Sequence, residues 1–168
     1  MKIKNVIVFF AVLAGLFGLM WWGKPAVIST VPTPGSNVTT GNNLTAEEKL
    51  YDFGTISMAK GNVDHRFKIT NPTNEDVEIK DIATSCMCTI AYLESATGEK
   101  GPFGMSGHSG PTARVSEIIK AGESREIRVV YDPNAHGPAG VGPINRLVYL
   151  TDSSRKTLEL EIKALVTP

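Results

Sequence analysis

The sequence has no excess of charge of either sign and very little cysteine. Among its 168 residues, 17 basic side chains balance 17 acidic ones, and only two residues are cysteine. A basic surface typical of nucleic-acid-binding proteins is therefore not indicated, nor is an acidic tail. The sequence also lacks a Gly-x-Ser-x-Gly motif, a phosphate-binding loop and a dinucleotide fingerprint. We predict a protein that is not an enzyme and does not bind nucleic acid.

The one long apolar run lies at the N-terminus. Residues 6–23 (VIVFFAVLAGLFGLMWWG) carry no charge, and this length approaches the ~20 residues of a membrane-crossing helix. Lys2 and Lys4 favour an N-terminus on the inner side, and the paired tryptophans suit the membrane–water interface. Bulky residues stand where signal-peptide cleavage requires small ones. We predict that residues 1–23 form a single-pass signal-anchor in the cell membrane, with the C-terminal domain outside the cytoplasm; a cleaved signal peptide is the alternative.

The rest of the chain divides into a linker and a domain. Residues 24–48 are rich in Pro, Ser, Thr and Asn and are expected to be a flexible linker. Within residues 49–168, segments such as VDHRFKITN, SREIRVVYD and TLELEIKALV alternate apolar and polar residues, as strands do. Only residues 45–50 (TAEEKL) look helical. Seven or eight short strands with polar turns predict an all-β domain, an immunoglobulin-like antiparallel β-sandwich.

Several segments in this order resemble one known family. They are YDFGTI, HRFKITN, IKDIATSCMCT, IKAGESREIRVVYDP and a closing strand that ends in LVTP. Together they resemble the bacterial domain-of-unknown-function 1573 family over about residues 50–168. The resemblance implies an exported immunoglobulin-like sandwich, related in shape to ciliary ASH, major-sperm-protein and PapD-type domains. It implies no established catalytic activity.

Both cysteines lie in one short segment, ATSCMCTIAY, with Met87 between them. On a strand, Cys86 and Cys88 would point to the same face with Cα atoms about 6.5 Å apart, at the upper edge of the disulfide range. An oxidising compartment favours a disulfide, although a bridge that closes so small a loop would add little stability. Two neighbouring thiolates are equally suited to a soft metal ion. An inert structural pair is a further alternative.

A glycine-rich segment follows the cysteines at residues 97–112 (TGEKGPFGMSGHSGPT). We expect an open loop here, and long loops in compact domains are often functional. At polyproline spacing Met105 and His108 would stand about 9 Å apart, so the loop would have to curl at Gly107 to bring sulfur and imidazole together. Thiolate, thioether and imidazole donors favour copper, Cu(I) in particular, with zinc as the alternative ion. The predicted metal ligands are Cys86, Cys88, His108 and Met105.

Three functions remain open from the sequence. The first is a membrane-tethered, extracytoplasmic copper-binding module that acts in metal carriage, sensing or sequestration. The second is a non-catalytic domain that holds another envelope protein. The third is an exported thiol–disulfide exchange protein, although no basic residue next to the cysteines in the sequence would lower a thiol pKa. We expect an extracytoplasmic protein partner. His65 is expected to be a core histidine with its own partner, and His136 a turn residue, with metal binding as its lesser alternative.

Overall fold

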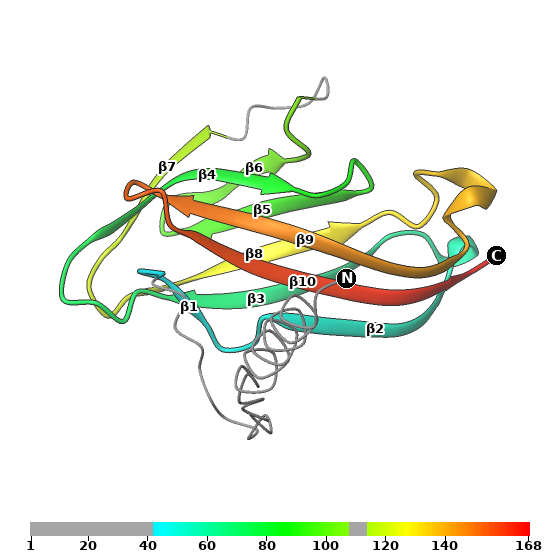
Figure 1. The fold of residues 1–168 in the computed structure, drawn as a ribbon, viewed down its shortest axis with the longest axis horizontal. Coiled ribbons are helices and arrows are strands. Elements are labelled where there is room, and N and C mark those ends of the chain that lie inside the picture. The colour runs from blue at the N-terminus through cyan, green and yellow to red at the C-terminus, as the bar shows by residue number, and fades with distance from the viewer. Residues whose placement is uncertain (1–41, 108–113) are drawn as a thin grey trace, which may run out of the picture. The chain divides into compact units, whose positions relative to one another are not determined.

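The computed structural model of the protein describes residues 42–107 and 114–168 (Figure 1). These residues form ten strands and two short 3₁₀ helices, Met58–Lys60 and Gly137–Gly140. The strands are β1 (Thr45–Ala46), β2 (Leu50–Ser57), β3 (Val63–Thr70), β4 (Val77–Thr84), β5 (Thr89–Ser95), β6 (Gly98–Phe103), β7 (Arg114–Ile119), β8 (Ser124–Tyr131), β9 (Gly142–Asp152) and β10 (Thr157–Thr167). No helix within the described residues is long and apolar enough to cross a membrane. The predicted anchor, residues 1–23, lies outside them.

The strands form two five-stranded sheets, in the orders β1-β3-β8-β5-β6 and β2-β10-β9-β4-β7 (Figure 1). The predicted all-β, two-sheet sandwich is confirmed in this form. The described residues contain ten strands rather than seven or eight, and the second sheet is mixed because β2 pairs with β10 in parallel. A parallel pair needs a long connection, and here strands β3 to β9 all lie between β2 and β10 in the sequence.

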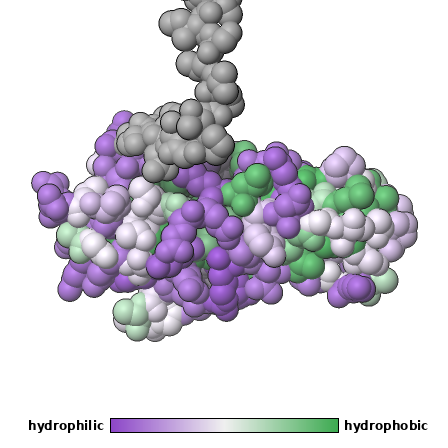
Figure 2. Space-filling model, turned by 90° about the horizontal axis from the view of Figure 1, so that it is seen from below, coloured by the Kyte–Doolittle hydropathy of each residue, from purple (hydrophilic) through white to green (hydrophobic). Residues whose placement is uncertain are grey.

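Alternating apolar residues build the core between the two sheets. Along β10 the inward positions are all buried, whereas the residues between them are more exposed. These inward residues are Leu158, Leu160, Ile162, Ala164 and Val166. The period-two pattern of TLELEIKALV is therefore confirmed as one buried and one outward face. The face seen in Figure 2 is mainly hydrophilic, with separate apolar patches over its surface.

The helix expected at residues 45–50 does not form. Thr45 and Ala46 pair with the end of β3 instead, and β2 begins at Leu50. Six residues are too few to stabilise a helix by their own propensity, and tertiary contacts decide the outcome. Leu44 is 3% exposed and packs into the core. Oε1 of Glu47 lies 2.6 Å from Nζ of Lys68 on β3.

The open loop expected at residues 97–112 is partly a strand. Residues 98–103 form β6, which pairs with β5, and Phe103 is 5% exposed in the core. Gly101 has a φ of 134°, and a Cβ at this position would lie 3.0 Å from Cδ1 of Tyr92. Glycine thus serves close backbone packing here rather than flexibility.

Candidate metal centre

The two cysteines lie in the turn between β4 and β5, not on a strand as the sequence predicted. The alternation ends before them, because Ile82, Ala83 and Thr84 are all buried in succession. β4 and β5 belong to different sheets, so the turn crosses one end of the sandwich. There the backbone leaves the strand conformation, and the two cysteines come closer together than strand geometry allows.

Hydrogen bonds hold this turn firmly. The hydroxyl of Thr84 lies 2.9 Å from the carbonyl oxygens of both Cys86 and Thr89. The N–H of Thr89 donates to the Cys86 carbonyl at 3.1 Å, which closes the turn. Ser85 then ties the turn to β9, since its N–H donates to the carbonyl of Leu147 and its hydroxyl accepts from the Leu147 N–H, both at 2.9 Å. The cysteine positions are therefore set by both sheets.

Cys86 and Cys88 form a disulfide with a Cα–Cα distance of 5.3 Å. This is shorter than the roughly 6.5 Å of a strand because the turn folds the backbone. The two sulfurs differ in environment. Cys88 is 2% exposed and belongs to the core, whereas Cys86 is partly exposed and the intervening Met87 is 57% exposed.

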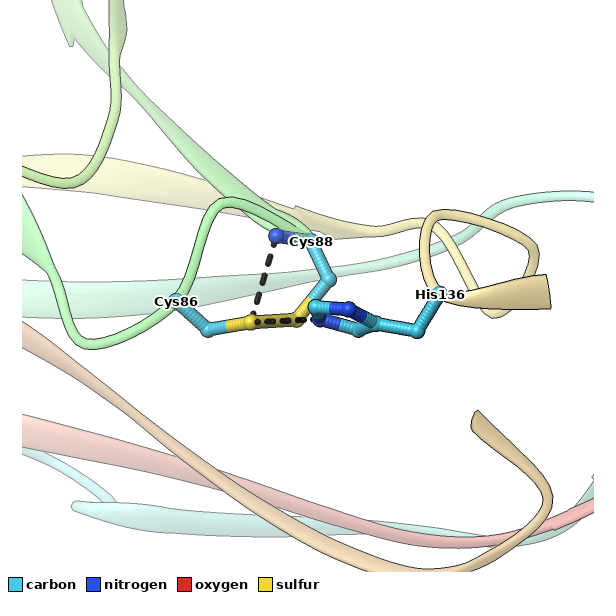
Figure 3. A group of neighbouring side chains, drawn as sticks. All are labelled: Cys86, Cys88 and His136. Atoms are coloured by element: carbon cyan, nitrogen blue, oxygen red, sulfur yellow. Dashed lines mark hydrogen bonds between the residues drawn. A yellow bond between two sulfur atoms is a disulfide. The ribbon is translucent and has the colours of Figure 1, made fainter. Parts of the chain in front are cut away.

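His136 reaches the cysteines from the loop after β8 (Figure 3). Its Nε2 lies 3.2 Å from the Sγ of Cys86, and the donor atoms of Cys86, Cys88 and His136 all lie within 4.8 Å of one another. The loop is anchored at its base because the Asn134 N–H donates to Asp132 at 2.8 Å. His136 is thus more than a turn residue: among the described residues it is the histidine that the fold brings to the cysteines.

Arg146 of β9 contacts the other sulfur. Its Nε donates to the Sγ of Cys88 at 3.2 Å. Arg146 occupies an inward position of β9, in the same frame as the buried Ile144 and Val148. The guanidinium also acts on Tyr131, whose pKa is raised by burial and partly lowered by the nearby positive charge. The sequence analysis missed this residue, although an arginine in an otherwise apolar frame was a usable signal.

Of the remaining predicted ligands, Met105 is described by the structure and lies on the segment next to β4. The N–H of Thr84 donates to the Gly104 carbonyl at 3.2 Å, and Thr84 forms a parallel bridge with Met105. The glycine-rich segment therefore passes beside β4 just before the cysteine turn. Metal binding by Met105 stays a prediction, as does binding by His108, which lies outside the described residues.

His65 has partners of its own. Its ring stacks on Tyr51 with centroids 3.6 Å apart and meets Phe67 edge-on, while Nε2 pairs with Glu48. The expected partner is therefore present, but His65 is only partly buried and is not part of the core as expected. These contacts also make His65 a suitable control for experiments on His136.

One solved structure with a TM-score above 0.5 supports the fold. A protein of unknown function from Porphyromonas gingivalis W83 aligns at 14% identity with a TM-score of 0.52, over 77% of this chain and 51% of that one. A secreted serine protease, VesC from Vibrio cholerae, aligns at 13% identity and a TM-score of 0.46, over 75% and 24% of the two chains. The ASH/PapD-like domain 7 of human CEP192 aligns at 11% identity and 0.45, over 86% and 98%. This chain therefore spans about half of the first protein's length and a quarter of the second's.

Among curated proteins, none matches this sequence. The family model described as protein of unknown function (DUF1573) matches residues 44–105. The match begins at the buried Leu44, includes the cysteine turn and ends at Met105. This match ends before β7 to β10, so it covers less of the chain than the resemblance that we predicted over residues 50–168. Over residues 44–105, the predicted resemblance to the DUF1573 family is thereby confirmed.

Proposed function

We propose that this chain is a membrane-tethered, extracytoplasmic module with an immunoglobulin-like domain that binds one Cu(I) ion in metal carriage, sensing or sequestration. The ligands are the thiolates of Cys86 and Cys88 and the imidazole of His136. The observation that carries the proposal is the convergence of these three donors within 4.8 Å, although His136 is 50 residues from Cys86 in the sequence. Thiolate and imidazole are donors that suit soft and borderline metal ions.

The charges around the site favour a monovalent ion. Cu(I) bound by two thiolates and a neutral imidazole forms a complex with a single negative charge, which the adjacent Arg146 offsets. With Zn²⁺ the same ligands form a neutral complex and leave the charge of Arg146 uncompensated. A closed structural zinc site also needs four ligands, and the group of His, Cys, Asp and Glu donors among the described residues has three members.

Metal binding requires that the disulfide first be reduced, because the thiolate is the metal ligand. The Cys86–Cys88 disulfide is then the metal-free, oxidised form of the same site. A reductant of the extracytoplasmic compartment would generate the binding form, and oxidation would release the ion. Met105 forms a bridge with Thr84, just before the cysteine turn, so Met105 and His108 are kept as alternative donors, which the variants below test.

The test is an anaerobic Cu(I) titration of the reduced full chain, in mild detergent, against a competing chelator. We expect one Cu(I) per chain. Cys86→Ser and Cys88→Ser should abolish tight binding, because each removes a charged ligand. His136→Ala should weaken binding by roughly tenfold to a hundredfold.

His65→Ala is the matched control, since this histidine binds Glu48 away from the sulfurs, and it should leave the Cu(I) affinity unchanged. His108→Ala and Met105→Leu test the loop donors separately. If His136→Ala binds as tightly as the wild type while His108→Ala does not, the imidazole comes from the loop. If reduced wild-type protein fails to compete with even a weak chelator, the metal proposal is wrong.

A protein-interaction domain is the second candidate, favoured by the open sheet edges. β7 ends one sheet, and its Ile118 is 52% exposed. An exposed edge strand with an apolar side chain can pair with a strand of a partner. Ile118→Lys should then abolish in vivo cross-linking to a defined envelope partner, whereas Leu165→Lys, on the interior strand β10, should not. Equal cross-linking in both variants would contradict an edge-pairing role.

A further inference from the structure

We propose that the Cys86–Cys88 disulfide is a directional exchange site, in which an incoming thiolate attacks Cys86 and Cys88 is the leaving sulfur. This activity goes beyond metal binding and does not depend on it. It rests on differences between the two sulfurs in access, in contacts and in anchoring. Each difference favours attack at Cys86 and release of Cys88.

Access differs first. Exchange requires that the attacking thiolate reach a sulfur along the disulfide bond. Cys88 is 2% exposed and packed into the core, so a thiolate outside the domain cannot reach it. Cys86 is partly exposed and lies beside the exposed Met87 at the tip of the turn. Attack from solvent or from a partner protein is therefore directed to Cys86.

The contacts differ as well. The leaving sulfur acquires a full negative charge, and Nε of Arg146 already donates to the Sγ of Cys88 at 3.2 Å. A hydrogen bond between two charged groups is about twice as strong as one between neutral groups. It is stronger still at a buried position, where water does not screen it. Within the described residues, no lysine or arginine contacts the Sγ of Cys86. Its neighbour is the imidazole of His136.

Cys88 is also held in place when the bond opens. Its carbonyl accepts from the N–H of Asp132 at 2.9 Å, at the end of β8. Thr89, the next residue, is fully buried and pairs with Tyr131 across the sheet. The freed thiolate thus stays beneath Cys86, ready for the return attack.

The proposed reaction is balanced with thiols as the co-reactant. A thiolate RS⁻ forms a bond to the Sγ of Cys86, the Cys86–Cys88 bond breaks, and its electron pair remains on Cys88 as a thiolate beside Arg146. A second thiolate then attacks the R sulfur of the mixed disulfide, which forms RSSR and releases the Cys86 thiolate. Overall, two thiols are oxidised to a disulfide and the cysteine pair is reduced to a dithiol.

The direct test is mapping of the mixed disulfide on metal-free, oxidised full chain in mild detergent with a chelator present. Limiting glutathione is added, the reaction is quenched with acid at short times, and the adduct is located by peptide mass spectrometry. We expect glutathione on Cys86, with Cys88 free, in an excess of at least about tenfold. Equal amounts on the two cysteines, an excess on Cys88 or no adduct at all would overturn the proposal.

Arg146 is tested as a positioning residue. Arg146→Met should slow the opening of the disulfide by glutathione about tenfold, because the leaving thiolate loses its charged partner. Arg146→Lys should restore part of the rate. Arg155→Met is the matched control, since Arg155 is exposed in the turn after β9, and it should react as the wild type does. An unchanged rate in Arg146→Met would contradict the role of the guanidinium.

Single-cysteine variants provide a second measurement that does not require the disulfide. In Cys88→Ser, the remaining Cys86 should react with an aromatic disulfide reporter at least about tenfold faster than Cys88 does in Cys86→Ser. Equal rates in two variants with wild-type circular dichroism would show that the sulfurs are equally accessible. Because no metal is present, a failure here is distinct from a failure of Cu(I) binding.

Discussion

Strand β9 carries two charged residues in its inward, otherwise apolar frame, and the two have different surroundings. Asp152, at the C-terminal end, is 4% exposed and accepts hydrogen bonds from Asn43, Ser154 and Lys156 at 2.8–3.0 Å. Arg146, near the middle of the strand, donates to the sulfur of Cys88. The neighbouring strand β10 has only apolar residues in its inward frame. The inward charge of Asp152 is surrounded by donors and supports a turn, whereas that of Arg146 is directed at a sulfur of the proposed site.

The largest expected effect on stability is at Asp152. Asp152→Ala leaves two backbone N–H groups and the Asn43 amide without their acceptor, and unsatisfied buried donors cost roughly 1–3 kcal/mol each. We expect the free energy of unfolding to fall by about 3 kcal/mol in urea denaturation, with Cu(I) affinity unchanged. Asp64→Ala, an exposed position on β3, should change stability by less than about 0.5 kcal/mol. A comparable loss in both variants would show that the turn contacts are unimportant.

A third charged residue at an inward position, Glu117, makes the stability of the domain depend on pH. Glu117 of β7 is 8% exposed and binds Lys100 at 2.7 Å and Arg125 at 3.0 Å. Burial alone would raise the pKa of Glu117, but the hydrogen bonds from these two cations outweigh it and hold the pKa below its usual value.

Glu117→Gln should therefore cost about 2 kcal/mol of unfolding free energy at neutral pH. Because the folded-state pKa is lowered, the wild-type advantage is present above the ordinary pKa of glutamate and is lost as the pH falls through the lowered one. Urea denaturation of both proteins between neutral and acidic pH measures this. If the difference in unfolding free energy between the two proteins stayed constant across this pH range, the charge of Glu117 would not contribute to stability.

The smallest effect on stability is expected at Arg146. Arg146→Met keeps most of the side-chain volume in the inward frame of β9, so stability should change by about 1 kcal/mol or less. Cu(I) affinity should nevertheless fall about tenfold, as when a group that supports metal ligands is removed. If Arg146→Met lost much stability but no Cu(I) affinity, Arg146 would have the supporting role that we assign to Asp152.

The alternation of apolar residues was enough to predict the body of the sandwich but not its ends. TLELEIKALV identified the inward face of β10 correctly, because strand periodicity is local. The link between Cys86 and His136 depends on the pairing of Thr89 with Tyr131, which no local pattern contains. The cysteine turn was mistaken for a strand because the turn is held by contacts with β5 and β9, such as those of Thr84 with Thr89 and of Ser85 with Leu147, which no local pattern contains.

The convergence of the cysteine pair with His136 is the central claim, and X-ray absorption spectroscopy of the Cu(I)-loaded full chain tests it most directly. The account predicts two sulfur atoms and one nitrogen atom bonded to copper in the wild type and in His65→Ala. In His136→Ala the nitrogen should be lost while both sulfurs remain. A copper ion bound by sulfur alone in the wild type, or a nitrogen that persists in His136→Ala, would contradict the site described here.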